Sequence, residues 1–510
     1  MNFKTQKISN KEKQNLSKNS LESFPKETKS LLFKEKEKEN TQNKIPKIGI
    51  NLIVFLLLLG IGFMTYGIYK TISHFDYSVL LKVAGTKLLT DDEGQTNFLI
   101  LGIGGDNHEG GNLTDSIIIA SLDDKKKHIS MVSIPRDFYI RDSTLGNSRI
   151  NEVYFYAKRH FQSDILGINF LKEKIENFID TEIHYYLMLD FQGFKEIIDT
   201  LGGIEVNVEK DINDPYYPKD GTILYETFRI KKGLQTLDGE TALKYARSRK
   251  TTSDFDRSNR QQEIIFATKE KALSLNTLLS TEKISEILNS LKENIKTNIS
   301  VGEILTLASI AKDYSKDNIS SHLLHDDPNS CGGLLYTPPR VEYGGSFVLL
   351  PAGGIDYLHK YFNLLFNYSK EASTSTKIHI LNGTKKGGVA TETRQILIRY
   401  CFLVNRFGNG RNQNIKETTY YYKERINENG EKISIRPDSL DFLQEIISGK
   451  ESSEIPEEYI EYILDTDIIL EIGDDYVSSE NYIKDPFYYL RINTVSTPST
   501  ETTQNTEVEN

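Results

Sequence analysis

The sequence predicts an α/β protein in which helices cover a sheet, preceded by one transmembrane helix, and three observations support this prediction. Residues 98–101, 117–122 and 129–134 are short apolar runs bounded by turn residues, which is typical of buried strands. From residue 166 to 208, helical spacing alternates with further short apolar runs, as in α/β domains. The third observation, an uncharged stretch over 48–69, adds one N-terminal transmembrane helix to the folded part.

The N-terminal region predicts a membrane anchor. Residues 1–47 hold twelve lysines, six glutamates and few apolar residues, so we expect a disordered cytoplasmic tail. Residues 48–69 match the roughly 20 residues that span a bilayer. A signal peptide, the alternative, would have a shorter apolar core and a small-residue cleavage site, and neither is evident. Because lysine-rich flanks stay inside, the chain after a connector at 70–96 is expected outside the cell membrane.

The next segment, 97–370, is expected to form one domain with its core at 97–267. Asp238 is a good N-cap for a helix that runs to Arg247, and Gly202-Gly203 ends the helix before it. The predicted elements are helices at 166–179, 191–200, 238–247, 275–295 and 301–314, a long helix that includes residues 257–261, strands at 185–189 and 204–208, and a surface loop at 211–221.

A second, smaller α/β domain is expected at 377–476, after a linker at 371–376. Its predicted elements are strands at 377–381, 402–407, 417–422 and 467–471 and a helix at 389–400. Residues 477–510 are expected to be a disordered tail, since their last fifteen are almost entirely small or polar.

Composition excludes some functions. The net charge is −10 although the first 47 residues are basic, so the folded part is acidic and nucleic acid is not expected as a partner. The glycines near residues 102 and 383 complete neither a dinucleotide fingerprint nor a P-loop. Cys331 and Cys401 match no metal-binding spacing, and the sequence leaves their pairing open.

Charged residues gather where the three first strands begin or end. Asp106 follows a glycine-rich turn, Asp115 precedes the second strand, and Arg136 and Asp137 follow the third. Ligands of open α/β sheets bind outside the carboxyl ends of strands, so these residues predict a site for a metal-bound phosphate. Loop carboxylates without a ligand, a simple tight turn and a surface ion pair at Asp137 are the alternatives.

A second cluster of basic residues lies further along the chain. Arg247, Arg249, Arg257 and Arg260 fall within fourteen residues, and we expect Arg257, Arg260 and Gln261 to share one helix face. Guanidinium groups pair bidentately with phosphate oxygens and stay charged, which suits a pyrophosphate. A solvated helix face is the alternative.

The ordered blocks of the chain resemble the LytR-CpsA-Psr family of membrane-anchored glycopolymer phosphotransferases. The blocks, between residues 97 and 267, are NFLILGIGG, LTDSIIIAS, MVSIPRDFYI, RINEVYFYA, DFQGFKEIIDTLGGIEVNV, LDGETALKYARSRK and DFDRSNRQQ. Residues 377–476 are similar to the small C-terminal domain often attached to this family. The resemblance implies a three-layer α/β/α fold with a mixed central sheet that buries a polyprenyl chain.

The resemblance also implies an activity and a site. Such enzymes move a glycopolymer from a polyprenyl-pyrophosphate carrier to a cell-wall acceptor, usually peptidoglycan. It implies Mg²⁺ held by Asp106 and Asp115, with Asp137 orienting an arginine or helping to deprotonate the acceptor. The phosphate-binding residues that it implies are Arg136, Arg149, Arg247, Arg249, Arg257, Arg260 and Gln261.

This chain departs from the family's pattern at one position, and two other functions are alternatives to glycopolymer transfer. This chain has Leu113-Thr114 where many members have Arg-Ser before the aspartate, so it lacks that arginine. A pyrophosphatase that uses water as acceptor would need the same residues. A non-catalytic envelope-binding or regulatory protein would bind the polyprenyl pyrophosphate without turnover.

Overall fold

The computed structural model describes residues 86–487 apart from 107, 109, 220–221, 223, 249–253, 275–280, 369–375, 423, 427–431, 435 and 438, and these residues belong to one compact unit. No helix in this part of the chain is both long and apolar enough to cross a bilayer. The predicted transmembrane helix at 48–69, the tail before it and most of the linker at 371–376 lie outside the described residues.

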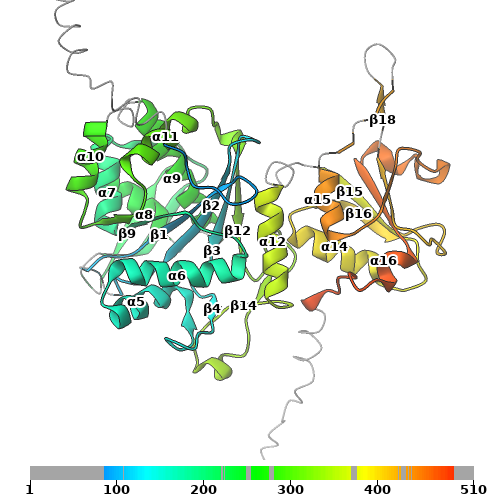
Figure 1. The fold of residues 1–510 in the computed structure, drawn as a ribbon, viewed down its shortest axis with the longest axis horizontal. Helices are drawn as coiled ribbons and strands as arrows, with labels where there is room; N and C mark the ends of the chain where they lie inside the picture. Colours follow the sequence, from blue (N-terminus) through cyan, green and yellow to red (C-terminus); the bar gives the residue numbers. More distant parts are fainter. Residues whose placement is uncertain are drawn as a thin grey trace, which may run out of the picture. The chain divides into compact units, whose positions relative to one another are not determined.

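A six-stranded mixed sheet forms the centre of the fold (Figure 1). Its strand order is β11-β6-β1-β2-β3-β12; β2 is antiparallel to β1 and β3, whereas β6 is parallel to β1 and β12 is parallel to β3. The strands are β1 (Thr96–Gly102), β2 (Ser116–Asp123), β3 (His128–Ile134), β6 (Tyr185–Leu189), β11 (Ile295–Thr297) and β12 (Ile319–Leu323). The three strands predicted first are confirmed, and so is a mixed α/β fold.

Helices cover both faces of this sheet, because successive side chains along each strand point to opposite faces and both sets are apolar. Leu99, Ile117 and Val132 share a buried cluster with residues of α5 (Ile150–Phe161), α6 (Asp164–Ile179) and α12 (Ile355–Asn367). Ile118 and Met131 pack on the other face, against α9 (Asp254–Ser274). Helices α7 (Phe191–Thr200), α8 (Gly239–Arg247), α10 (Thr281–Ser290) and α11 (Val301–Ala311) complete that side (Figure 1).

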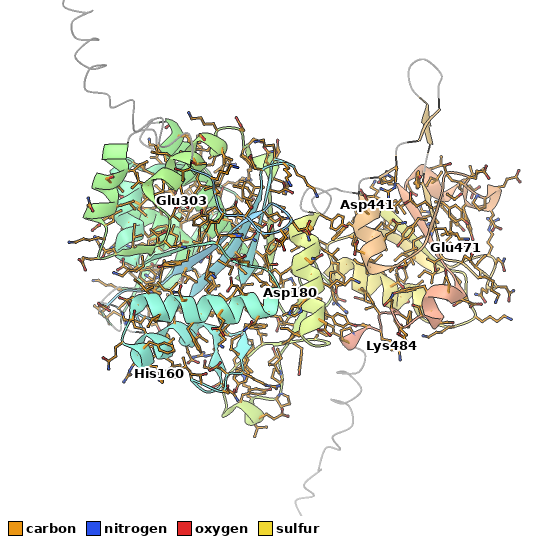
Figure 2. All side chains as sticks on the ribbon, viewed as in Figure 1. His160, Asp180, Glu303, Asp441, Glu471 and Lys484 are labelled. Atoms are coloured by element: carbon orange, nitrogen blue, oxygen red, sulfur yellow. A yellow bond between two sulfur atoms is a disulfide. The ribbon has the colours of Figure 1, made fainter. Side chains whose placement is uncertain are left out.

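Polar contacts tie the covering helices to the sheet. The hydroxyl of Tyr185 on β6 donates to the carboxylate of Glu303 at 2.6 Å, and Glu303 lies in the first turn of α11 (Figure 2). The Ser300 side chain caps the same helix through the backbone N–H of Glu303. These contacts position α11 against the edge of the sheet that β11 and β6 form.

Among the described residues, two of the two-stranded β-ribbons outside the central sheet bear on the sequence predictions. The strand predicted at 204–208 is present as β7 (Ile204–Val208), but it pairs with β10 (Gly233–Leu237) and not with the central strands. The surface loop expected at 211–221 is wrong: β8 (Ile212–Pro218) pairs there with β9 (Tyr225–Ile230). Ile212 and Tyr217 are buried in that ribbon, and a proline is tolerated at an edge position.

Between residues 97 and 370, the helix predictions fail in three places. Helix α5 was not predicted; its N-cap is Arg149, which is not a usual capping residue. Helix α12 was not predicted either. The helix expected over 275–295 is shorter, because α10 ends at Ser290 and Ile295 begins β11.

A second sheet of five strands lies in the C-terminal part, in the order β16-β15-β21-β17-β20. The bounds of the elements there are β15 (Lys377–Asn382), α14 (Val389–Arg399), β16 (Leu403–Asn409), β17 (Thr419–Tyr422), α15 (Ser439–Ile446), β20 (Lys450–Ser452), β21 (Ile468–Ile472) and α16 (Asp474–Ser478). The strands and the helix predicted there are thus present, whereas the helices α15 and α16 were not predicted. Residues 477–487, expected in the tail, are packed: the buried guanidinium of Arg399 lies 2.6 Å from Asp485.

A disulfide joins the segment after β12 to the end of α14. It links Cys331 to Cys401, and the Nδ1 atom of His322 lies 3.6 Å from the Cys331 sulfur. Nearby, the side chain of Arg399 donates to the carbonyl of Pro328 at 2.8 Å. The segment that follows β12 is therefore held to the C-terminal part by covalent and polar contacts.

Candidate functional site

Five strands of the central sheet bring their ends to one edge. Gly102 on β1 pairs with Ser116, and Ile117 on β2 pairs with Ile134, so the start of β2 lies between the ends of β1 and β3. β6 and β12 end at the same edge, because they run parallel to β1 and β3. The prediction that the charged residues flanking these strands meet at one edge of the sheet holds for Asp115, Arg136 and Asp137.

A chain of alternating charges runs along this edge. The guanidinium of Arg136 lies 3.1 Å from Asp115 Oδ1 and 3.5 Å from Asp137 Oδ2. Asp137 also contacts Arg149 at 3.3 Å, and Arg149 contacts Glu152 at 2.7 Å. The hydrogen bond to Glu152 raises the pKa of Arg149. Each guanidinium has five N–H donors, so these ion pairs leave donors that a phosphate could use.

The start of α5 holds these strand ends together. The backbone N–H of Asn151 donates to Arg136 O at 3.3 Å, and its side chain donates to Asp115 Oδ1 at 3.4 Å. The backbone N–H of Thr114 donates to Asn151 O at 3.0 Å. Thr114 is fully buried, so the residue that replaces the usual serine has a structural part in the site.

The glycine-rich turn after β1 places Asp106 at the surface. Gly105 has a φ of +86°, and its N–H donates to Gly111 O at 2.9 Å. A Cβ atom at Gly111 would lie 1.8 Å from Gly105 O, so a larger residue cannot occupy that position without moving the turn. The side chain of Asp106 is exposed, and Asn112 Nδ2 lies 3.5 Å from its carboxylate.

Asp190 is a site residue that the sequence reasoning missed. It follows β6 and caps α7, where its carboxylate accepts a hydrogen bond from the Gly193 N–H at 2.8 Å. Burial raises the pKa of Asp190, and the charge of Asp106 contributes to the same shift. In the sequence, Asp190 stands between an apolar run and the start of a helix, which is the pattern of a helix N-cap. That pattern does not indicate that Asp190 lies near Asp106.

A polar cavity opens above β2 and β3 at this edge. It brings together residues that are far apart in the chain: Asp115, Arg136, Asp137, Arg257 and Gln261 line one part of it. The segment after β12 and an apolar segment near residue 348 line the rest, with His325, Asp326, Phe347 and Leu349.

An apolar cavity adjoins the polar one. It lies between strands β6, β1 and β2 and helices α7, α8 and α9, and Ser116 and Gln261 line both cavities. Its other lining residues are Ile100, Leu101, Gly102, Ile103, Ile118, Leu189, Asp190, Phe191, Phe194, Leu243, Ala246, Arg247 and Ile265. This apolar cavity therefore shares its boundary with the polar one.

Arg247 lies at the apolar cavity and apart from the chain of charges. Its guanidinium stacks 4.0 Å from the ring centroid of Phe191, donates to the Tyr217 hydroxyl at 3.0 Å and lies 3.2 Å from His108 Nε2. His108 belongs to the turn that carries Asp106. Arg247 thus connects the end of α8 to that turn.

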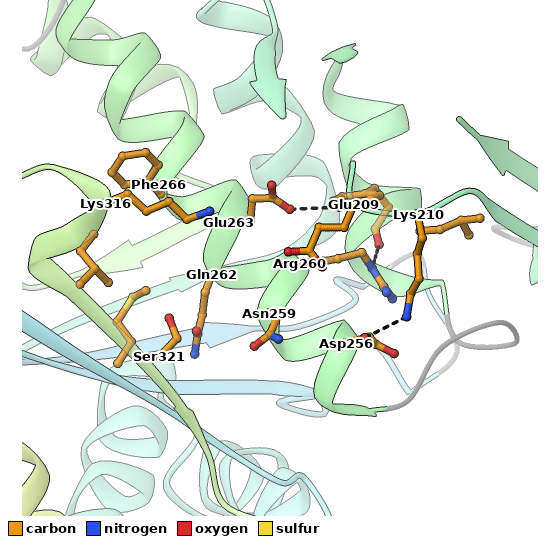
Figure 3. A pocket seen from close by; sticks show the side chains of 14 residues that line it. Glu209, Lys210, Asp256, Asn259, Arg260, Gln262, Glu263, Phe266, Lys316 and Ser321 are labelled. Carbon is orange, nitrogen blue, oxygen red and sulfur yellow. Dashed lines mark hydrogen bonds and ion pairs between the residues drawn. The ribbon is translucent and has the colours of Figure 1, made fainter. Parts of the chain in front are cut away.

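Arg260 is not placed with Arg257 and Gln261. It lines a third cavity, together with Lys210, Asp256 and Glu263 (Figure 3). Its Nε donates to Tyr245 O at 2.8 Å, and another nitrogen donates to a backbone carbonyl of the segment that follows α8. The expectation that Arg260 shares one face with Arg257 and Gln261 is therefore wrong, and Arg249 lies outside the described residues.

Comparisons with known proteins identify relatives of this chain. The model of the LytR_cpsA_psr family matches residues 68–341. A protein named polyisoprenyl-teichoic acid–peptidoglycan teichoic acid transferase TagV, of Bacillus subtilis strain 168, is 31% identical over 65% of this chain and 82% of its own. A TagU of the same description from Enterococcus faecalis is 28% identical over 52% of this chain and 81% of its own.

Solved structures are similar too. The crystal structure of B. subtilis TagV is 28% identical in sequence, covers 54% of this chain and 97% of its own, and has a TM-score of 0.41. The family model alone spans more than half of the chain, including every element of the polar cavity except the segment near residue 348. This chain belongs to the LytR-CpsA-Psr family.

Proposed function

We propose that this chain is a membrane-anchored phosphotransferase that moves a glycopolymer from a polyprenyl-pyrophosphate carrier onto a cell-wall acceptor such as peptidoglycan. One observation carries the proposal: the polar cavity with its arginines adjoins an apolar cavity, and Ser116 and Gln261 line both. A diphosphate joined to a hydrocarbon chain has the same division of polar and apolar surface. The relatives named as teichoic acid transferases with a polyisoprenyl donor support this reaction.

The donor would lie across the two cavities. Its isoprenoid chain would occupy the apolar cavity, where burial of apolar surface stabilises it by roughly 25 cal/mol per Å². Arg136 and Arg257 would bind the diphosphate oxygens in the polar cavity, beside Gln261. Arg149 does not line that cavity and would act through Asp137, whose carboxylate it contacts at 3.3 Å.

The chemistry is phosphoryl transfer with stabilisation of charge. The guanidinium groups would neutralise the charge that develops on the leaving polyprenyl phosphate. Asp106 and Asp115 have the oxygen ligands that Mg²⁺ prefers, and the ion commonly binds one or two carboxylates and completes its shell with phosphate and water. Arg136 and Asn151 both donate to Oδ1 of Asp115, which leaves its Oδ2 for a metal. Mg²⁺ bound there would polarise the attacked phosphate.

Localisation and the finer fold belong to the same proposal. Residues 48–69 would anchor the chain as a single-pass helix with the N-terminus in the cytoplasm and the sheet outside. Residues 377–476 would form the small C-terminal α/β domain often attached to this family, consistent with the five-stranded order of the second sheet.

The test supplies the full chain in detergent with a labelled polyprenyl-pyrophosphate-linked glycan, Mg²⁺ and peptidoglycan. Label that becomes bound to peptidoglycan supports transfer, and Arg136→Ala should yield no such product. Release of free phosphorylated glycan at the same rate with or without peptidoglycan would identify a pyrophosphatase. Donor binding without any product would identify a non-catalytic binding protein.

A further inference from the structure

We propose that Asp326 receives the proton of the acceptor hydroxyl when that hydroxyl attacks the phosphate. This inference rests on the proposed transfer reaction and adds the catalytic residue on the acceptor side. Asp326 lines the polar cavity together with Arg136 and Arg257 and comes from the segment that follows β12.

The strand order places Asp326 on the side of the site opposite the apolar cavity. That cavity lies over β6, β1 and β2, whereas the polar cavity lies over β2 and β3 and extends to the end of β12. The boundary between the two is formed by Ser116 and Gln261. A donor whose chain enters over β1 therefore places its phosphates over β2 and β3, with Asp326 beyond them.

The geometry of phosphoryl transfer requires this opposite side. The attacking oxygen and the leaving oxygen lie roughly in line through the phosphorus. The leaving group is the polyprenyl phosphate, which lies toward the apolar cavity, so the acceptor hydroxyl arrives from the side of β12. A base must lie within hydrogen-bond reach of that hydroxyl.

Asp115, Asp137 and His325 also line the polar cavity, but each is already engaged. Arg136 and Asn151 donate to Asp115, which the proposed function assigns to Mg²⁺. Asp137 lies between the guanidinium groups of Arg136 and Arg149, at 3.5 Å and 3.3 Å. His325 accepts a hydrogen bond from the Asp327 N–H on Nδ1 at 3.0 Å, so its Nε2 carries the hydrogen and donates to the Cys331 carbonyl at 2.8 Å. None of these three groups is available to take a proton from an incoming hydroxyl.

The carboxylate of Asp326 is positioned but not neutralised by a cation among the described residues. The hydroxyl of Thr337 donates to its Oδ2 at 3.1 Å, and the side chain is otherwise exposed. Its segment is fixed to the sheet, since Leu324 N–H donates to Ser133 O at 3.0 Å. The neighbouring His325 pairs with Leu335 through the backbone at 3.0 Å. The carboxylate of Asp326 therefore lines the acceptor side of the cavity, with one oxygen bound by Thr337 and the other without a partner among the described residues.

The step balances as a substitution at phosphorus. The acceptor oxygen forms a bond to the phosphorus that carries the glycan, and the bond from that phosphorus to the bridging oxygen breaks. The electron pair of that bond leaves with the polyprenyl phosphate. The hydroxyl proton passes to a carboxylate oxygen of Asp326 and then to solvent, so no oxidant or other co-reactant is needed.

The test compares Asp326→Asn with Asp327→Asn in the full chain. Asp327 is the adjacent carboxylate, but it accepts hydrogen bonds from Asn329 and Ser330 within its own turn and does not line the cavity. Removing a general base typically costs about 10² to 10⁴ in rate. We expect that loss in transfer by Asp326→Asn, with donor binding unchanged, while Asp327→Asn transfers at the parental rate.

A second readout separates a base from a structural role. Model acceptors with a more acidic hydroxyl need less help from a base, so they should narrow the difference between Asp326→Asn and the parent. A uniform loss for all acceptors, or an unchanged rate of transfer, would overturn the role of Asp326 while leaving the transferase proposal in place. A parent protein that transfers to no acceptor would overturn both.

Discussion

The guanidinium of Arg136 lies 3.1 Å from the carboxylate of Asp115, although 21 positions separate the two residues in the chain. The antiparallel register of β2 and β3 makes this ion pair possible, because it places the start of one strand beside the end of the other. The pair holds the guanidinium over the polar cavity with a fixed orientation. Arg136 is therefore the residue whose loss should be most informative about catalysis.

Substitution of Arg136 by alanine should reduce transfer by a factor of about 10² to 10³, which is typical for removing one donor to a developing charge. Product formation with saturating labelled donor measures the effect. The matched control is Arg229→Ala, since Arg229 is exposed on β9 and donates only to Asn213 among the described residues. Parental activity of Arg136→Ala would remove this residue from the site.

Asp106→Asn should raise the Mg²⁺ concentration needed for half-maximal activity. The amide lacks the charge that a hard divalent cation requires, and its effect is easier to interpret than that of Asp115, which also holds Arg136. A titration of activity with Mg²⁺ measures the change. Asp124→Asn serves as the control, because Asp124 lies beyond the other end of β2. An unchanged titration would contradict a metal role for Asp106.

Ala246→Phe should weaken binding of long polyprenyl donors. Ala246 is buried on α8 and lines the apolar cavity, so a ring there fills space that the hydrocarbon chain would occupy. We expect a loss of affinity of about tenfold, or roughly 1.4 kcal/mol, for a long chain and a smaller loss for a donor with two isoprene units. Binding of both labelled donors measures the difference.

The control for this substitution is Ala311→Phe, which places the same ring at the end of α11 and away from both cavities. Overpacking alone typically costs about 1 to 3 kcal/mol of stability, so the melting temperatures of both variants must be compared with the parent. Equal weakening of long and short donors would show that the apolar cavity does not hold the chain.

The sequence could predict the helices that begin or end at capping residues and glycines, and the strands that form continuous apolar runs. Helix α7 has the predicted bounds because Asp190 caps its start and glycines follow its end. Strands β1, β2 and β3 were predictable because buried strands are continuous apolar runs. Helix α5 was missed because it begins at Arg149, without a usual cap residue, and its capping box comes from Glu152.

The positions of site residues could be predicted only for residues that flank neighbouring strands of the sheet. Residues that flank strands converge whenever the strands are neighbours, so Asp115 and Arg136 were placed correctly. Spacing along a helix is less decisive: at about 100° per residue, Arg257 and Gln261 lie about 40° apart, whereas Arg260 and Gln261 lie about 100° apart. Arg260 therefore faces another cavity. The disulfide across 70 positions depends on the packing of the two parts, which spacing does not reveal.

Stability should fall in mild acid because His322 is buried in its neutral form. Burial lowers the pKa of His322 to about 4, from an ordinary value of 6.5. Below pH 6.5 the unfolded chain binds a proton that the folded chain does not, so the free energy of unfolding falls as the pH decreases toward 4, by at most roughly 3 kcal/mol. Urea unfolding between pH 7.5 and pH 5 measures how the free energy of unfolding depends on pH. This dependence should have a smaller slope in His322→Gln than in the parent.

The control is His160→Gln, at an exposed position, which should keep the parental slope. The charge of His128 contributes to the lowered pKa of His322, so His128→Gln should flatten the slope less than His322→Gln does. Parallel slopes for His322→Gln and the parent would mean that His322 is not buried as a neutral side chain in solution.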